Sequence, residues 1–246
     1  MDRAPAHVDG DALARSLAEL ASPNGDDLDV KAAIERVVMG AAGVFPGTGV
    51  GLMLIADDGL TLRYVASSDE VARRLELAHE RAGEGPCIDA FVCDAIVRTD
   101  DLADEPRWPG LRARLRDEPI RAVLGLPTRI GAAPVGTLNL YSRGPRAWDA
   151  SEISALEAYN GLLEARLGSA LLARAHGEVV DQLQFALDSR VAIERAIGLL
   201  MGRDGLDHAA AFQLLRAQAR DSRRRVLAVA EDVLAAHPVS GYSSSG

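Results

Sequence analysis

Arginines gather near the carboxyl end of the chain, within a stretch of ten residues. They are Arg216, Arg220, Arg223, Arg224 and Arg225. Asp221 is the only acidic residue among them. A guanidinium group binds phosphate oxygens through two parallel hydrogen bonds and stacks on nucleic-acid bases. The cluster is open to two interpretations: a solvated helix face, which is the commoner role of a charge run, and a nucleic-acid contact surface.

Two cysteines, Cys87 and Cys93, are the other candidates for chemistry. A thiol becomes a nucleophile or a redox partner when its pKa is lowered, and no His or Lys lies next to either cysteine in the sequence. We therefore interpret both as small apolar residues of a core. A thiol reductase that uses this pair remains an alternative hypothesis.

Other catalytic and metal-binding motifs fail on spacing. The chain has one lysine, Lys31, and Val30 precedes it, so no phosphate-binding loop G-x-x-x-x-G-K-[ST] exists. His79 and Glu80 lack the second histidine of H-E-x-x-H, and no P-C-x-x-C follows the H-x-E at residues 176–178. We predict no catalytic residues, no metal site, no cofactor and no enzymatic activity.

Composition limits the class of protein. The chain has 246 residues, 27 basic and 36 acidic, with a formal net charge of −9. This length fits one or two domains, and two cysteines cannot form a disulfide scaffold, so a reducing cytosol is expected. No apolar run reaches the roughly 18–20 residues that cross a membrane. We expect a cytoplasmic protein whose acidic surface still allows a local basic patch.

The first two thirds of the chain alternate between helix and strand patterns. Helical spacing of apolar residues covers 13–20, 30–42 and 69–82. Strand patterns cover 50–56, 60–66, 95–97, 122–126 and 135–141, with turns at 57–59 and 131–134. Strands in hairpins, with helices before and between them, predict an α+β fold with a mainly antiparallel sheet.

From residue 149 onward the pattern is helical throughout. Apolar residues recur at steps of three, four or seven from Ile153 to Val191, with an interruption at Gly177, which predicts one long helix or two collinear ones. This stripe either packs on its own domain or forms a parallel dimer seam over residues 151–197. Three short helices are predicted at 190–201, 207–220 and 222–236.

These patterns divide the chain into four segments. We predict a disordered start at 1–10, an α+β domain at 11–172, an all-α bundle at 173–237 and a disordered tail at 238–246. Residues 176–246 carry nine acidic residues and eight arginines, a net charge of −1, which leaves −8 for the first 175 residues.

Five ordered blocks in the bundle carry a resemblance to a known family. They are LQFALDSR at 183–190, IERAIGLLM at 193–201, AFQLLR at 211–216, RRV at 224–226 and VAEDV at 229–233. Together they resemble the ANTAR domain, a three-helix RNA-binding module of bacterial transcription antiterminators, over roughly 176–237. The chain departs from the family at Ile197, where many members carry lysine.

The preceding domain resembles the GAF sensor domain over roughly 11–172. The blocks are GEGPCIDA at 83–90, DLADEPRWP at 101–109 and VGTLNLYS at 135–142. A GAF domain joined by a long helix to an ANTAR bundle is similar to a group common in actinobacteria, which agrees with the Arg-rich composition.

The resemblance implies a function. ANTAR domains bind tandem hairpins in nascent leader RNA and keep a terminator from forming, under control of the sensor domain. The implied contact residues are Arg216, Arg220, Arg223, Arg224 and Arg225, together with Arg190 and Arg203, either of which can instead bond within the bundle. Ala196, Gly198, Met201, Phe212, Leu215 and Ala230 are expected to pack the bundle.

The implied partners are the RNA, a second copy of the chain paired through 151–197, and an unidentified small molecule in the GAF domain. A DNA-binding regulator that uses 207–236 as a helix-turn-helix is a further alternative.

Overall fold

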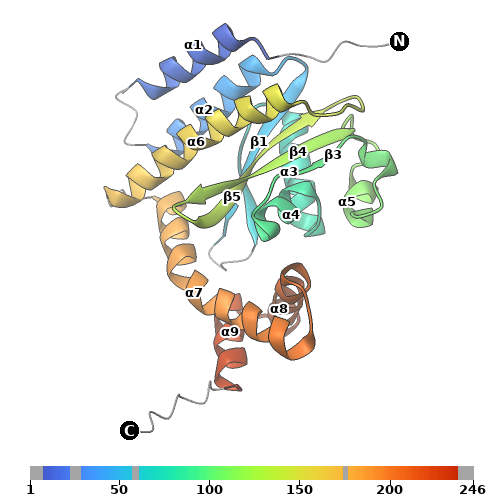
Figure 1. Ribbon diagram of the computed structural model, residues 1–246, viewed down its shortest axis with the longest axis vertical. Helices are drawn as coiled ribbons and strands as arrows, with labels where there is room; N and C mark the ends of the chain where they lie inside the picture. Colours follow the sequence, from blue (N-terminus) through green and yellow to red (C-terminus); the bar gives the residue numbers. More distant parts are fainter. Residues whose placement is uncertain (1–7, 23–28, 57–60, 174–176, 238–246) are drawn as a thin grey trace.

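The computed structural model describes residues 8–22, 29–56, 61–173 and 177–237 (Figure 1). Within these ranges, an antiparallel sheet of five strands forms the centre, in the order β2-β1-β5-β4-β3. The strands are β1 (Thr48–Ile55), β2 (Leu62–Ser67), β3 (Val97–Thr99), β4 (Ala122–Ile130) and β5 (Ala133–Ser142). The predicted antiparallel α+β fold is confirmed, whereas the turn predicted at 57–59 lies outside the described residues.

The hairpin between β4 and β5 sets the register of the central strands. Ile130 pairs with Ala133, and Gly131 between them has φ +61°, a left-handed conformation that glycine adopts without steric cost. The register brings Leu138 of β5 opposite Leu126 of β4 and Leu52 of β1. All three side chains are buried.

Three helices cover one face of the sheet: α1 (Gly10–Ala21), α2 (Val30–Val44) and α6 (Ala150–Leu172) (Figure 1). Val8 is buried and Asp9 caps α1 through hydrogen bonds to two backbone N–H groups. Residues 8–10 therefore belong to the fold, which corrects part of the predicted disordered start. Residues 1–7 and the predicted tail at 238–246 lie outside the described residues.

The opposite face carries α3 (Glu70–Ala82), α4 (Pro86–Cys93), a 3-10 helix (Leu102–Asp104) and α5 (Pro109–Arg114). A tight loop joins α3 to α4. Gly83 ends α3 at φ +68° and Gly85 precedes α4 at φ +132°. Both values lie where side chains other than glycine are strained, so the two glycines determine how α4 leaves α3. Residues 8–172 are called the sheet domain below.

The apolar stripe of α6 packs on this domain. Leu156, Leu163 and Leu167 are fully buried, and α6 contacts β4 and α2 of the same chain. Asn160, a polar residue on the stripe, accepts a hydrogen bond from Thr128 Oγ1 at 2.7 Å and donates to the Pro127 carbonyl at 2.9 Å. These leucines are therefore not available for a parallel dimer seam.

A hydrogen bond from α6 to α1 gives a stability prediction. The Tyr159 hydroxyl, on a fully buried ring, donates to Ser16 Oγ at 2.7 Å. We expect Tyr159→Phe to lower the free energy of unfolding by about 1 kcal/mol, because Ser16 loses this partner while the ring stays packed. Urea denaturation measures the change. Tyr64→Phe, on a half-buried ring, is the control and should change stability less; an equal loss in both variants would contradict the assignment.

The remaining helices are α7 (Glu178–Asp204), α8 (His208–Ser222) and α9 (Val226–Ala235), called the bundle below. The prediction of one long helix or two collinear ones is wrong about direction. α6 ends at Leu172, α7 begins at Glu178 after Gly177 at φ +142°, and α7 turns away from the axis of α6 (Figure 1). Moreover, residues 190–201 are the second half of α7, because neither glycine nor proline interrupts the helix from 178 to 197.

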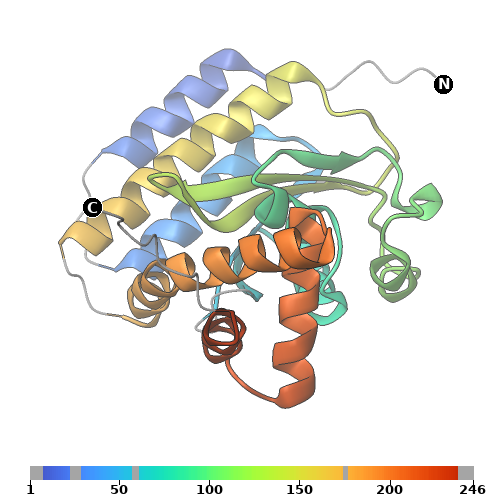
Figure 2. The ribbon, with the colours of Figure 1, turned by 60° about the horizontal axis from the view of Figure 1, so that its bottom comes forward.

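The bundle lies against one side of the sheet domain. Figure 2 shows α7 running along this side, where it contacts β1 and β5. No helix in the described parts of the chain is both long and apolar enough to cross a membrane.

Candidate nucleic-acid interface

The bundle has a tightly packed interior made by its three helices. Ala196 and Leu200 of α7, Leu215 of α8 and Ala230 of α9 are fully buried. Four of the expected packing residues, Ala196, Phe212, Leu215 and Ala230, are buried, and Met201 is half-buried. Gly198 is an exception, because it is exposed and a Cβ there would meet no atom within 4 Å.

Ile197 also lies in this interior, with 1% of its surface exposed. A lysine at this position would have to bury its charge or displace the packing of α7. The departure at Ile197 therefore fills the core of the bundle.

The turn between α8 and α9 presents an exposed arginine corner. Arg220 lies in the last turn of α8, Arg223 ends that helix at φ +55°, and Arg225 is the N-cap residue of α9. With Arg224 between them, all four side chains are exposed. The structure thus places four of the five clustered arginines, with exposed side chains, around the turn between α8 and α9, called the arginine corner below.

The arginine corner is held by weak surface contacts. Arg224 pairs with Asp232 of α9, and Arg220 Nε lies 3.8 Å from Asp221 Oδ1. The Arg225 guanidinium lies over the Phe185 ring of α7, 5.7 Å from its centroid. Exposed ion pairs contribute little to stability and are screened by salt, so a phosphate group competes with them readily.

Arg216 does not belong to the exposed corner. Its side chain is half-buried, and Nη1 donates to the Gly83 carbonyl of the sheet domain at 2.9 Å. Arg190 is also engaged by the sheet domain, through a hydrogen bond from Nη1 to the Pro134 carbonyl at 3.2 Å. Arg190 pairs with Glu194 at 3.0 Å as well. The structure thus places two of the seven predicted contact residues between the domains.

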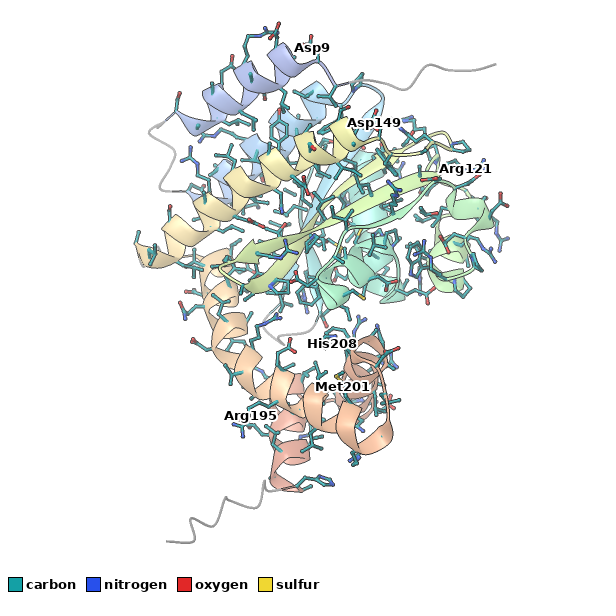
Figure 3. All side chains as sticks on the ribbon, viewed as in Figure 1. Asp9, Arg121, Asp149, Arg195, Met201 and His208 are labelled. Carbon is teal, nitrogen blue, oxygen red and sulfur yellow. The ribbon has the colours of Figure 1, made fainter. Side chains whose placement is uncertain are left out.

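Arg203 lies at the carboxyl end of α7, where two hydrogen bonds join it to the adjacent Asp204. Arg195 was not among the predicted residues. It is exposed on α7, and Figure 3 shows it on the outer side of that helix. Its exposure alone does not make it part of the arginine corner.

Aromatic and polar contacts join the two domains. Phe91 of α4 meets Phe212 of α8 edge to face, with ring centroids 6.3 Å apart. His208, at the start of α8, lies on the side of the bundle that faces the sheet domain (Figure 3), and its contact with Glu194, at 3.3 Å, is within the bundle. The ring contact and the bonds from Arg190 and Arg216 are the contacts that join the bundle to the sheet domain.

The contact between the domains is not completely filled. A cavity of about 480 Å³ remains, with Phe91 and Pro134 of the sheet domain on one side and Leu187 and His208 of the bundle on the other. The two domains therefore enclose a pocket between them, and their contact is not continuous.

The structure separates the two cysteines. Cys87 is fully buried and Cys93 is exposed, and both are free thiols. They lie at opposite ends of the eight-residue helix α4, six positions apart. This corresponds to roughly 9 Å along the axis, whereas a disulfide needs Cα atoms within about 7 Å. Burial raises the pKa of both thiols, which disfavours the reactive thiolate.

Thiol titration checks this separation. In the native protein, we expect a bulky aromatic disulfide reagent to modify one thiol quickly, Cys93, and the second only after unfolding. Cys93→Ser should abolish the fast phase, and Cys87→Ser should leave it unchanged. Two fast thiols, or a disulfide in the oxidised native chain, would revive the reductase hypothesis.

A polar cluster lies inside the sheet domain, between α3, α4 and the sheet. Glu76, His79 and Cys87 are all fully buried, and a ligand atom from each lies within 4.8 Å of the others. Asn139 Nδ2 of β5 donates to both Glu76 carboxylate oxygens, at 3.0 and 3.1 Å. Burial raises the pKa of Glu76 to about 8 and lowers that of His79 to about 3. Both side chains are therefore mainly uncharged near neutral pH.

The sequence did contain a signal for this cluster. The predicted helix at 69–82 has Val71, Leu75 and Ala78 inward, and a residue four positions after Leu75 shares its face. His79 is therefore an inward-facing residue, and Glu76 lies one turn before it. Asn139 of β5 is 63 residues away from Glu76 along the chain, so the sequence did not show that it joins the cluster.

An antiparallel sheet between helical layers, with polar groups in its core, precedes a small helical bundle that exposes an arginine corner. This arrangement joins an α+β domain to a helical module that exposes basic side chains. Comparison with known families agrees: the GAF domain family matches residues 27–163 and the ANTAR domain family matches residues 181–234. The chain belongs to the GAF family and carries a carboxyl-terminal ANTAR domain.

Solved structures confirm the fold of the sheet domain. The GAF domain of a phosphoenolpyruvate-protein phosphotransferase from Coxiella burnetii is 18% identical, with a TM-score of 0.54, over 68% of this chain and 96% of that one. The corresponding domain from Acinetobacter is 18% identical, with a TM-score of 0.53, over 65% of this chain and 92% of that one. A free methionine-R-sulfoxide reductase from Neisseria meningitidis, in complex with its substrate, is 18% identical, with a TM-score of 0.53, over 66% of this chain and 89% of that one. No curated protein matches the chain significantly.

The two domains give the class of function. GAF domains are sensor domains and ANTAR domains are RNA-binding domains of antitermination, so the chain is a regulator of that kind.

Proposed function

We propose that this protein is a transcription antiterminator whose bundle binds tandem hairpins in nascent leader RNA. The observation that carries the proposal is the arginine corner, which exposes four guanidinium groups in a protein of net charge −9. Proteins read RNA hairpins through unstacked loop bases and the backbone, and arginine serves both contacts. Phe185, beneath Arg225, adds an aromatic surface close to the corner.

The sheet domain controls this activity by holding the bundle. In the docked arrangement Arg216 is engaged by Gly83, and Arg190 by Pro134, so two guanidinium groups are withheld from RNA. If the contact between Phe91 and Phe212 were released, Arg216 and Arg190 would leave the sheet domain and could bind RNA together with the arginine corner. A signal shifts this balance only if it binds the two arrangements with different affinities.

A homodimer suits a tandem target, because binding of the first hairpin places the second at high local concentration. The apolar stripe of residues 151–197 is largely buried within the chain, but Leu172 and Val191 in this segment are 89% and 66% exposed. We propose that a dimer formed through this segment uses these exposed residues.

Fluorescence anisotropy of a labelled tandem-hairpin leader RNA tests the proposal. We expect binding that weakens steeply as salt rises, because phosphate contacts release counterions. An RNA with the second hairpin unfolded should bind more weakly, and duplex DNA should not compete. Binding that is insensitive to salt, or equal competition by duplex DNA, would overturn the RNA assignment.

A further inference from the structure

We propose that Glu76, His79 and Cys87 form a binding site for one Zn²⁺ ion, or another divalent transition metal of similar preference, inside the sheet domain. Among the described residues, these three side chains form a group whose ligand atoms all lie within 4.8 Å of one another. Carboxylate oxygen, imidazole nitrogen and thiolate sulfur are the protein donors that Zn²⁺ takes. All three are fully buried, where unpaired polar groups are costly.

The backbone holds the three donors in place. Glu76 and His79 are three residues apart on α3, which puts them on one face of that helix, and Cys87 lies in the first turn of α4. Bonds of about 2.0–2.3 Å place tetrahedral ligands roughly 3.3–3.8 Å apart. Side-chain rotations that move the ligand atoms inward by about 1 Å would bring the group to that spacing.

Unused lone pairs in the cluster support a bound ion. His79 Nδ1 lies 3.1 Å from the Leu75 carbonyl and 3.7 Å from Glu76 Oε2. The carbonyl can only accept, which assigns the ring proton to Nδ1 and leaves a lone pair on Nε2. Within the described residues, neither His79 Nε2 nor Asn139 Oδ1 has a hydrogen-bond partner, although both are buried. A histidine that ligates a metal through one nitrogen commonly donates its other N–H to a backbone carbonyl, as His79 does here.

Asn139 is suited to complete the site. Its Nδ2 group orients the Glu76 carboxylate. A Cβ on Gly125 would be 3.3 Å from both Asn139 Oδ1 and Cys87 Cα, so Gly125 leaves open the space between these two residues. The amide oxygen, which is buried and has no hydrogen-bond partner among the described residues, is the candidate for a fourth ligand.

The charges balance when the ion binds. A dication replaces the thiol proton of Cys87 and the carboxyl proton of Glu76, and both protons pass to solvent. The two anionic ligands and the neutral imidazole then leave the core with no net charge. The cost of burying an ion is therefore much smaller than for an unpaired charge.

The site lies next to the contact that holds the bundle. His79 is in the last turn of α3 and Cys87 in the first turn of α4, and the loop between them includes Gly83, whose carbonyl holds Arg216. An ion that ties these two helix ends together would change the geometry of that loop. We infer that binding of the ion is a signal that the sheet domain passes to the bundle and that changes its affinity for RNA; this part alone rests on the proposed function.

Co²⁺ is the probe for the site, because its bond to a thiolate gives a charge-transfer absorption. We expect the metal-free full-length chain to bind one Co²⁺ with this band, and Zn²⁺ to displace it. Cys87→Ala and His79→Gln should lose the band, and Cys93→Ser, the matched control, should keep it. No band, or an undiminished band in Cys87→Ala, would overturn the site.

Two further measurements keep the proposal testable if a variant fails to fold. Native mass spectrometry of the wild-type chain should show one Zn²⁺ per chain that a strong chelator removes; the absence of this species would overturn the site. Anisotropy of tandem-hairpin RNA with and without Zn²⁺ should show at least a fivefold change in wild type and none in Cys87→Ala. Metal binding without that change would overturn the input role, and RNA binding in neither state would overturn the proposed function.

Discussion

Replacement of Arg224 and Arg225 by alanine is expected to weaken binding of a tandem-hairpin RNA by about a hundredfold, since two charge-assisted contacts are removed at once. Both side chains are exposed, and Arg224 gives up a surface ion pair with Asp232 and a 3.4 Å hydrogen bond to the Ala228 carbonyl, so the fold should be retained. Anisotropy at fixed ionic strength measures the loss. The slope of log affinity against log salt should also fall by about 1.4, or 0.7 for each lost contact.

The matched control removes the same charge elsewhere. Arg114 and Arg116 are exposed on the sheet domain at the end of α5, outside the bundle; Figure 1 shows α5 at the edge of the sheet. Alanine at both positions should change RNA affinity by less than about threefold, because only long-range attraction is lost. An equal loss in the two double variants would mean that net charge, and not the arginine corner, determines binding.

Phe91→Ala is expected to strengthen RNA binding by about tenfold. Phe91 is 5% exposed and meets Phe212 across the domain contact, so its truncation removes about 2 kcal/mol of apolar and aromatic contact. The docked arrangement then loses population, and Arg216 and Arg190 become available to RNA. RNA affinity is measured by anisotropy, and release of the bundle by limited proteolysis of the α6–α7 connection.

Phe45→Ala controls for a general loss of stability. Phe45 is equally buried but lies at the end of α2, where it packs against Tyr159, 6.4 Å between centroids. We expect it to lower stability without raising RNA affinity. Unchanged or weaker RNA binding by Phe91→Ala would show that docking does not restrain the bundle.

Most of the sheet follows from local signals in the sequence. Gly131 and the apolar runs around it specify the β4–β5 hairpin, because turn geometry and strand alternation act over a few residues. The arginine corner was predictable for the same reason: Arg220 to Arg225 lie on two helix ends and the turn that joins them.

The features missed by sequence reasoning depend on contacts between distant segments. Arg216 lies in the same cluster as Arg220, yet its position is decided by Gly83, 133 residues earlier in the chain. The apolar stripe of α6 has a spacing that fits both a dimer seam and a helix packed on its own domain. Only its contact with β4 decides between them. The cluster around His79 appears only when β5 brings Asn139 against α3.

Hydrogen exchange of the full-length protein, with and without tandem-hairpin RNA, tests the central claim most directly. We expect RNA to slow exchange of backbone amides in residues 220–228, where the arginine corner binds. Exchange should become faster in 86–93 and 208–216, where α4 and α8 separate. Unchanged exchange in 220–228, or protection confined to the sheet domain, would contradict the claim that the bundle binds RNA and that the sheet domain restrains it.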